Sequence, residues 1–297
     1  MINALLPKLL QPLTRSLTTH RFLHPYLWRY LIRVRNHFAT VEEDCEFVTT
    51  IEKTIRVRTK LSDHIESQLF WQGFQEADEG VLRLIYKYLP RDGIFFDIGA
   101  NIGSLTLVGA KIASAGQIYA FEPSDHHCAR LTYNLSLNNF ANVTLIKKGL
   151  YNAAGTATLY RPSTDEMINN SGAASLYPNT AIAEKLFNEK IELIKLDDFV
   201  KEQHIFRIDL IKIDIEGSEY NALLGGVTTL KRFRPVVLIE LDQDNLHRAG
   251  CTSADILNFW YDLNYQVSRI DINGEVTPVN SEADLGRHQN LLCQPQT

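Results

Sequence analysis

From about residue 80 onward, the chain alternates between two hydrophobic patterns. Short apolar runs, typical of buried strands, are followed by stretches in which apolar residues recur every three or four positions, as on one face of a helix. The runs predict strands at 94–98, 117–121, 143–147, 208–213 and 236–239. Because strands that alternate with helices form parallel sheets with right-handed crossovers, this order predicts a doubly wound α/β domain.

The alternation of strand and helix patterns is interrupted between residues 150 and 196, where strands are expected at 156–161 and 191–196 around a polar loop. It resumes with a helix near residue 260 and short strands at 266–270 and 290–293. The pattern therefore predicts a seven-stranded, mostly parallel sheet within a domain that spans residues 71–297.

The first 70 residues carry a different pattern, with apolar residues at helical spacing and basic residues between them. The segment from Met1 to Val41 contains no Asp or Glu, but it contains six Lys and Arg residues. We expect a basic, helical extension over residues 1–70. An amphipathic basic helix of this kind can lie on an anionic membrane surface, here through residues 1–40, or pack on the main domain or a second copy in a homo-oligomer. These alternatives stay open.

Composition narrows the class of protein. The 297 residues are 45% hydrophobic and 22% charged, as in ordinary globular proteins. A net charge of -5 argues against nucleic acid as a partner. The four cysteines are far apart, which favours reduced thiols in a cytoplasmic protein over disulfides or a zinc site. With no apolar run near 18 residues, no transmembrane helix is expected, and peripheral membrane contact is the remaining membrane option.

A glycine loop follows the first predicted strand. The strand ends on Asp97, the sequence G-A-N-I-G (Gly99 to Gly103) follows, and a helical pattern then begins. This order presents backbone N–H groups to a nucleotide-like ligand. The dinucleotide fingerprint has glycine where Asp97 stands, and a carboxylate there would repel a pyrophosphate. An acid suits the amino group and sulfonium of S-adenosylmethionine, so the loop favours a methyl donor over NAD.

Acidic residues end four of the predicted strands: Asp97, Glu122, Asp214 and Glu240. Ligands of open α/β sheets bind at the carboxyl ends of the strands. Glu122 stands 19 residues after Gly103, close to the distance of about 20 at which a second-strand acid binds ribose hydroxyls. The alternative is that these acids only cap the following helices.

Four segments together resemble the FkbM family of S-adenosylmethionine-dependent methyltransferases: DIGANIG (97–103), AFEP (120–123), LDD (196–198) and KIDIEGSE (212–219). The resemblance covers roughly residues 70–245. It implies a Rossmann-like class I methyltransferase fold and O-methylation of a hydroxyl, often on a sugar or a secondary metabolite. The family's donor site then implies cofactor-binding roles for Asp97, Gly99, Ala100, Asn101 and Gly103 at the methionine part, Glu122 at the ribose and Gly149 near the adenine.

Methyl transfer to a sugar hydroxyl needs a group that takes the hydroxyl proton. We expect Asp214 to be the general base, with Glu216 orienting it or sharing its role, and no metal. A rival account makes Asp214, Glu216, Glu240 and Asp242 oxygen ligands of Mg²⁺. His126 and His127 are expected on a solvent-facing side of a helix.

The sequence therefore predicts an S-adenosylmethionine-dependent O-methyltransferase with a saccharide or other small-molecule acceptor. Trp71, Phe74 and Tyr177 are candidates for stacking on a sugar ring. The alternative is a donor-binding subunit without catalysis, which acts on a partner through the N-terminal segment. An NAD-dependent oxidoreductase is disfavoured by Asp97.

Overall fold

The computed structural model describes residues 2–19, 29, 32–33, 37–38, 45–162, 172–178 and 186–296. The chain divides into two compact units. Unit 1 comprises Met1–Asp78 and Pro162–Gly172, and unit 2 comprises Glu79–Arg161 and Ala173–Thr297. Most of the polar loop predicted between the two strands after residue 150 lies outside the described residues.

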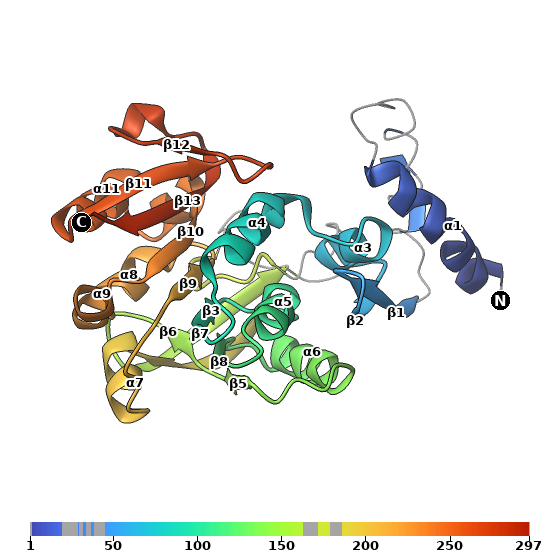
Figure 1. Ribbon diagram of the computed structural model, residues 1–297, viewed down its shortest axis with the longest axis horizontal. Coiled ribbons are helices and arrows are strands. Elements are labelled where there is room, and N and C mark those ends of the chain that lie inside the picture. Colours follow the sequence, from blue (N-terminus) through green and yellow to red (C-terminus); the bar gives the residue numbers. More distant parts are fainter. Residues whose placement is uncertain are drawn as a thin grey trace. The chain divides into compact units, whose positions relative to one another are not determined.

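Unit 2 is built on an eight-stranded sheet (Figure 1). From one edge to the other, its strands are β12 (Val276–Pro278), β11 (Tyr265–Ile270), β13 (His288–Pro295), β10 (Val236–Asp242), β9 (Leu210–Ile213), β3 (Ile94–Ile98), β4 (Gln117–Phe121) and β5 (Val143–Ile146). The five strands from β10 to β5 are parallel, and β13 runs antiparallel between β10 and β11.

The predicted α/β fold with a mostly parallel sheet is confirmed, with two differences in the strands. The edge strand β12 is an eighth strand that the pattern did not predict, because its three residues are all exposed and carry no buried–exposed alternation. The two strands expected after residue 150 do not join the main sheet.

Helices cover both faces of this sheet because successive strand residues alternate between two apolar clusters. Phe95 packs with residues of α4 (Glu79–Tyr88) and α5 (Ser104–Ile112), while α6 (Asp125–Ser136) covers Ala120 on the same face. Phe96 packs on the other face, against α7 (Leu196–Glu202), α8 (Glu219–Leu224), α9 (Val227–Phe233) and α11 (Ser253–Asp262). A short helix, α10 (Gln243–Arg248), follows β10 directly.

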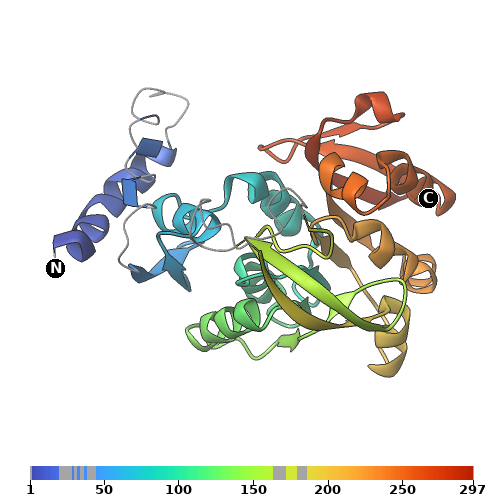
Figure 2. The same ribbon diagram turned by 180° about the vertical axis from the view of Figure 1, so that it is seen from behind.

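A separate three-stranded sheet interrupts the alternation. Its strands, in the order β6 (Gly149–Leu150), β8 (Leu186–Ile194) and β7 (Gly155–Pro162), include the two expected after residue 150. Figure 2 shows the long strands β7 and β8 from behind. Leu159, Ile191 and Leu193 form a small apolar cluster of their own on this sheet.

Unit 1 contains helices α1 (Ile2–Thr19) and α3 (His64–Trp71) and the short turn η1 (Glu76–Asp78). It also contains an antiparallel hairpin of β1 (Glu46–Ile51) and β2 (Ile55–Lys60), which the expectation of a helical extension missed. The strict alternation of exposed and buried residues along β1 is the strand signal that was present. Trp71 is only 3% exposed in the core of this unit, so it is not a platform for a sugar.

Within the described part of the chain, none of the helices combines the length and hydropathy that a membrane span needs.

Trp260 on α11 provides a test of the unit 2 core. Its side chain is fully buried, and its ring centroid lies 4.9 Å from that of Tyr265 on β11. We expect Trp260→Ala to lower the free energy of unfolding by about 3–5 kcal/mol, because it removes a large buried aromatic group. Denaturant titration measures this loss, and the 77% exposed Phe206, replaced by Ala, is the control, with an expected change within about 0.5 kcal/mol. Equal effects of the two substitutions would contradict this account of the core.

Candidate active site

The candidate site lies where the chain reverses its direction across the sheet. From β3 the chain moves outward through β4 to β5, and it returns to β9 and β10 on the other side of β3. The register pairs Ile98 with both Phe121 and Ile213, and Ile213 with Ile239. The residues that follow these strand ends are therefore neighbours, at the switch point where open α/β sheets bind ligands.

The loop after β3 needs its glycines. Gly99 and Gly103 have φ angles of +81° and +89°, and Asn101 has a φ of 51°. A Cβ on Gly99 would lie 1.8 Å from the carbonyl oxygen of Asp214, so the loop backbone rests directly on the segment after β9. The backbone N–H groups of Gly99 and Ala100 donate to the carbonyl of Phe121, at 2.9 and 3.0 Å, which ties the loop to the end of β4.

Asp97 carries a buried acceptor atom that has no hydrogen-bond partner among the described residues. The residue is 1% exposed, and the Thr106 hydroxyl donates to its Oδ2 at 2.5 Å. Its Oδ1 receives no hydrogen bond from the described residues, and the Lys212 Nζ lies 4.0 Å away. Burial raises the pKa of Asp97, against the lowering effect of the Lys212 charge. An unpartnered buried oxygen beside a glycine loop fits the ammonium group of a bound methyl donor.

Glu122 holds the glycine loop from the next strand. Its Oε2 accepts the N–H of Asn101 at 2.9 Å, and its Oε1 accepts the N–H of Ser124 at 3.0 Å. Burial raises the pKa of Glu122, but His127 and these two N–H groups together bring it below the usual value. The carboxylate is therefore ionised. Oε2 has a further lone pair, so the predicted contact with a ribose hydroxyl stays open at this atom.

His127 was expected to face solvent, and that expectation is wrong. Its side chain is 2% exposed, and its Nδ1 lies 3.4 Å from the Oε1 of Glu122.

The two remaining residues that were predicted to bind the cofactor, Ala100 and Gly149, are tightly packed. Ala100 is buried in a cluster with Ala120 and Leu131. Gly149 pairs with Leu193 on β8, and a Cβ on it would lie 2.8 Å from the Leu193 side chain.

Three carboxyl groups meet on the other side of the glycine loop. Oxygens of Asp214, Glu216 and Glu240 all lie within 4.8 Å of one another, and we call these residues the acidic trio. The trio is partly open to solvent, with the Asp214 and Glu240 side chains 25% and 13% exposed. β10 extends to Asp242, beyond its predicted end, so Glu240 lies within the strand.

The three carboxyl groups of the acidic trio have different pKa values. Burial raises the pKa of Asp214, but the Lys212 ammonium, 3.2 Å from its Oδ2, and a hydrogen bond from Glu240 bring it below the usual value. Burial and the charge of Asp214 raise the pKa of Glu216 to about 8 and that of Glu240 well above its usual value. At neutral pH, Asp214 is therefore the ionised member, and Glu216 and Glu240 hold protons.

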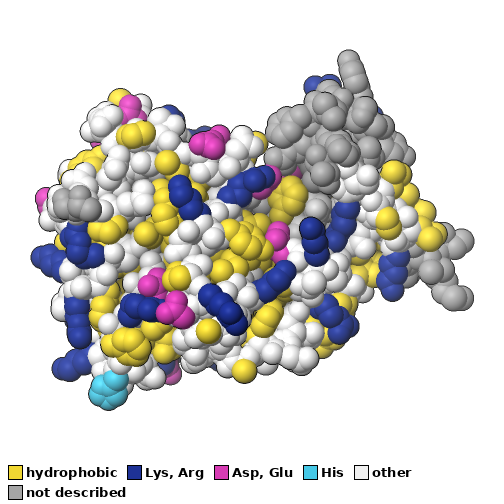
Figure 3. Space-filling model, viewed as in Figure 1, with side chains coloured by type: hydrophobic (Ala, Val, Ile, Leu, Met, Phe, Trp, Pro, Cys, Tyr) yellow, Lys and Arg dark blue, Asp and Glu magenta, His cyan; other side chains and the backbone are white. Residues whose placement is uncertain are grey.

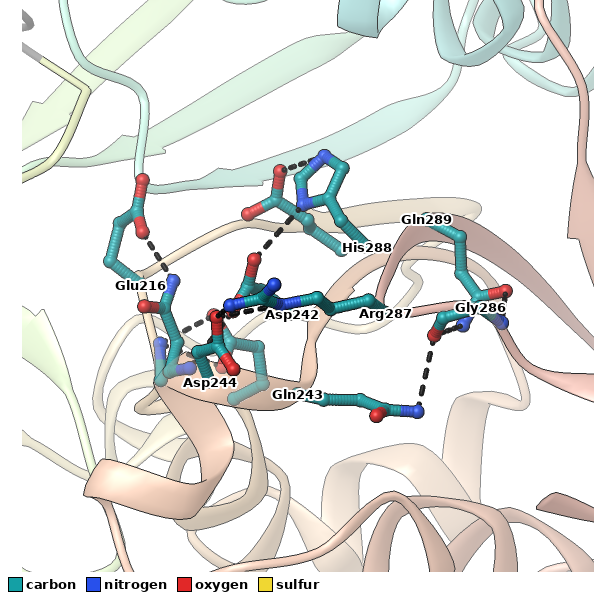
Figure 4. Close-up of polar contacts among 12 residues, drawn as sticks. Glu216, Asp242, Gln243, Asp244, Gly286, Arg287, His288 and Gln289 are labelled. Carbon is teal, nitrogen blue, oxygen red and sulfur yellow. Dashed lines mark hydrogen bonds and ion pairs between the residues drawn. The ribbon is translucent and has the colours of Figure 1, made fainter.

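Glu216 is fixed from several sides. It has a φ of 53° in a turn whose N–H groups, those of Ile215 and Gly217, donate to the buried Glu219 carboxylate. The side-chain amide of Asn245 donates to the Glu216 Oε2 at 2.5 Å, as Figure 4 shows. The Ser175 hydroxyl donates to the Glu216 carbonyl at 2.6 Å, which brings the segment before Tyr177 to the trio.

His288 joins the site from the last strand, and sequence reasoning missed it. Its Nε2 lies 3.5 Å from the Oε1 of Glu240, and its Nδ1 lies 3.4 Å from the Oδ2 of Asp242 (Figure 4). Asp242 itself accepts the N–H of Asn245 and so caps α10. Asp242 therefore has a structural role, and among the described residues the oxygen cluster consists of the trio.

The fold and the site define a Rossmann-like methyltransferase: a switch point with a glycine loop, a buried acid near the end of β3 with one oxygen that accepts no hydrogen bond from the described residues, and a second acid after β4. The family model for the methyltransferase FkbM domain matches residues 97–267, more than half of the chain. The chain belongs to this family, and the methyl donor is S-adenosylmethionine.

Several curated relatives are methyltransferases. The hexuronic acid methyltransferase AglP of Haloferax volcanii is 24% identical over 72% of this chain and 78% of its own length. The 2-O-methyltransferase NoeI of Sinorhizobium fredii is 26% identical over 55% and 70%. Methyltransferase sdnD of Sordaria araneosa is 31% identical over 46% of this chain, and the match covers 61% of sdnD.

Solved structures with a similar chain path include SMU.1697c of Streptococcus mutans in complex with SAH, with a TM-score of 0.43 and 13% identity over 73% of this chain and 97% of that one. Methyltransferase FkbM of Methylobacillus flagellatus has a TM-score of 0.42 and 14% identity over 78% and 55%.

Asp97→Asn tests the donor side. The substitution removes the charge that faces the ligand, so we expect the affinity for S-adenosylhomocysteine to fall about ten- to hundredfold, the usual effect of losing a charge-assisted hydrogen bond. Calorimetry measures this change, and Asp198→Asn, at an exposed acid, is the matched control. Unchanged binding by Asp97→Asn would mean that the ligand's ammonium contacts another group.

Proposed function

We propose that this chain transfers the methyl group of S-adenosylmethionine to a hydroxyl group of a saccharide or another small hydroxylated molecule. One observation carries the proposal: the glycine loop and the acidic trio are in direct contact. Gly99 packs on the Asp214 carbonyl, and the Lys212 Nζ donates to the Gly99 carbonyl at 3.3 Å while it pairs with the Asp214 carboxylate. A proton acceptor beside a methyl-donor loop is what O-methylation requires.

On the donor side, the loop residues Asp97, Gly99, Ala100, Asn101 and Gly103 would hold the methionine part of the cofactor, Glu122 its ribose, and Gly149 would lie near its adenine. When bound, the cofactor supplies an electrophilic methyl group on a sulfonium. The Asp97 Oδ1, buried and unpartnered, is the atom that would accept a hydrogen bond from the cofactor's ammonium.

On the acceptor side, the proposed proton acceptors are Asp214 and Glu216. In the reaction the hydroxyl O–H bond and the bond between the methyl carbon and the donor's sulfur would break, and the oxygen would form a bond to the methyl carbon. The proton would pass to the protein, and the neutral thioether S-adenosylhomocysteine would leave. Lys212 makes Asp214 a weak base, whereas the pKa of Glu216, about 8, matches the task better. We therefore assign the proton to the Glu216 carboxylate, with ionised Asp214 orienting the acceptor hydroxyl.

One relative supports a sugar as the acceptor, and a second supports methylation of an oxygen. AglP is named for a hexuronic acid and NoeI for 2-O-methylation, and both match more than half of this chain. Of the three aromatic candidates for stacking, Tyr177 is the one that belongs to the segment held on Glu216 by Ser175. Its hydroxyl is fixed by Tyr151, at 2.9 Å, and Asn221, at 3.1 Å.

The rival magnesium account has three oxygen ligands in the trio, but a cation already stands beside Asp214. Lys212 is only 8% exposed and is paired with the Asp214 carboxylate. If a metal ion took its place beside Asp214, the lysine ammonium would be left buried without this partner. We propose that the trio handles protons without a metal, so activity in EDTA should equal activity with added Mg²⁺.

Glu216→Gln tests the proposed base. With radiolabelled methyl donor and a panel of hydroxylated saccharides, we expect kcat to fall by about 10²–10⁴, the usual contribution of general base catalysis, while affinity for S-adenosylhomocysteine is kept. Because the base must lose its proton, the wild-type kcat/KM should rise with pH through about 8, and this rise should disappear in the variant.

Exposed Glu202, replaced by Gln, is the control and should leave both the rate and its pH profile unchanged. A wild-type protein that binds S-adenosylhomocysteine but turns over no acceptor would favour the donor-binding subunit. A variant that keeps the wild-type pH profile would remove Glu216 from the proton transfer.

A further inference from the structure

Helix α1 of unit 1 has two different faces. One face carries the buried Pro7 and Thr14 and the partly buried Leu10, Gln11 and Arg15, which follow one another at steps of one or three residues. This is the spacing of a single helical stripe, so one side of α1 is committed to unit 1.

The contacts of this stripe are mostly polar. The Gln11 amide donates to the Thr49 hydroxyl at 2.7 Å and to the Phe70 carbonyl at 2.8 Å. The Thr14 hydroxyl donates to the Trp71 carbonyl at 2.9 Å, and the Arg15 guanidinium donates to the Leu69 carbonyl at 2.9 Å. These bonds fix the rotation of α1 about its own axis, so which side chains face outward is determined.

The outward face is the apolar one. Leu6, Leu9 and Leu13 are 42%, 74% and 57% exposed, and their spacing places them in one row. Figure 3 shows hydrophobic side chains over α1, at the right of the view. An ordinary surface helix has the reverse arrangement, with apolar residues inside and polar residues outside. A row of exposed leucines on a fixed helix marks an interaction surface.

The positive charge of the N-terminal segment favours an anionic partner. Lys8 on α1 is exposed, as are Arg29 and Arg33 further along the segment. The first 41 residues contain six Lys and Arg residues and no acid, and the acids of unit 1 begin at Glu42. An exposed apolar helix face in a segment with an excess of Lys and Arg is the composition of helices that insert at the boundary between anionic headgroups and acyl chains.

We propose that α1 binds unit 1 to an anionic lipid surface, with Leu6, Leu9 and Leu13 inserted and the basic side chains at the headgroups. The exposed leucines of α1 are observed independently of methyl transfer, so this proposal and the proposed function can fail separately.

The test is flotation of the full chain with vesicles. We expect binding to vesicles of equal parts phosphatidylcholine and phosphatidylglycerol, weak binding to phosphatidylcholine alone, and a decrease when NaCl is raised from about 0.1 to about 0.5 M, because salt screens the attraction. Leu9→Glu should lower the partition coefficient at least about tenfold, since it removes apolar area and adds a like charge to the anionic surface. Leu13→Gln, which adds no charge, should lower it less.

Phe206→Glu is the matched control, because Phe206 is a 77% exposed apolar side chain of unit 2. It should float like the wild type. A circular dichroism spectrum and a denaturation midpoint equal to those of the wild type show that each variant is folded. Sedimentation equilibrium without vesicles tests whether a second copy of the chain binds the leucine row instead. A dimer that Leu9→Glu dissociates, together with no flotation, would identify the second copy as the partner and overturn the proposal. No flotation by a monomeric wild type, or equal flotation of Leu9→Glu and Phe206→Glu, would also overturn it.

Discussion

The site depends on one buried ammonium group. The Lys212 Nζ lies 3.2 Å from the Asp214 carboxylate, 3.3 Å from the Gly99 carbonyl and 4.0 Å from the Asp97 carboxylate. The two nearer oxygens are within hydrogen-bonding distance and come from the glycine loop and from the segment after β9, while Asp97 is reached only by the charge of the ammonium. Because a buried charge is costly without partners, the lysine holds the glycine loop and the segment after β9 in one arrangement.

The same ammonium sets the protonation of the trio. It favours the ionised form of Asp214, and the resulting negative charge, added to burial, opposes ionisation of Glu216 and Glu240. Three identical functional groups thus acquire different roles from their surroundings alone, since only one of them has a cation within hydrogen-bonding distance. The pKa of Glu216, about 8, follows first from burial and then from the negative charge of Asp214, which Lys212 keeps ionised.

Sequence periodicity predicted the part of this arrangement that depends on local pattern. The strand that carries Asp97 and the strand that ends just before Glu122 have the bounds that the apolar runs predicted, and the register of a parallel sheet then brings the strand-end acids together. It did not predict contacts made by packing. His127 occupies a helix position that looks solvent-facing, but it turns toward Glu122. His288 reaches Glu240 through an antiparallel pairing between β10 and β13, and no pattern in the chain specifies which strand β13 joins.

The N-terminal segment shows a different limit of sequence reasoning. Leu9 and Leu10 are neighbours of the same type, and helical spacing alone groups both with the apolar stripe. In the structure Leu10 packs on the core of unit 1 while Leu9 is 74% exposed, because polar bonds from Gln11 and Arg15 decide how the helix is rotated. If burial of apolar area alone decided the rotation of α1, Leu6, Leu9 and Leu13 would face the core of unit 1. The backbone carbonyls at the end of α3 instead bind the polar side chains of α1, and so the row of leucines remains on the outside.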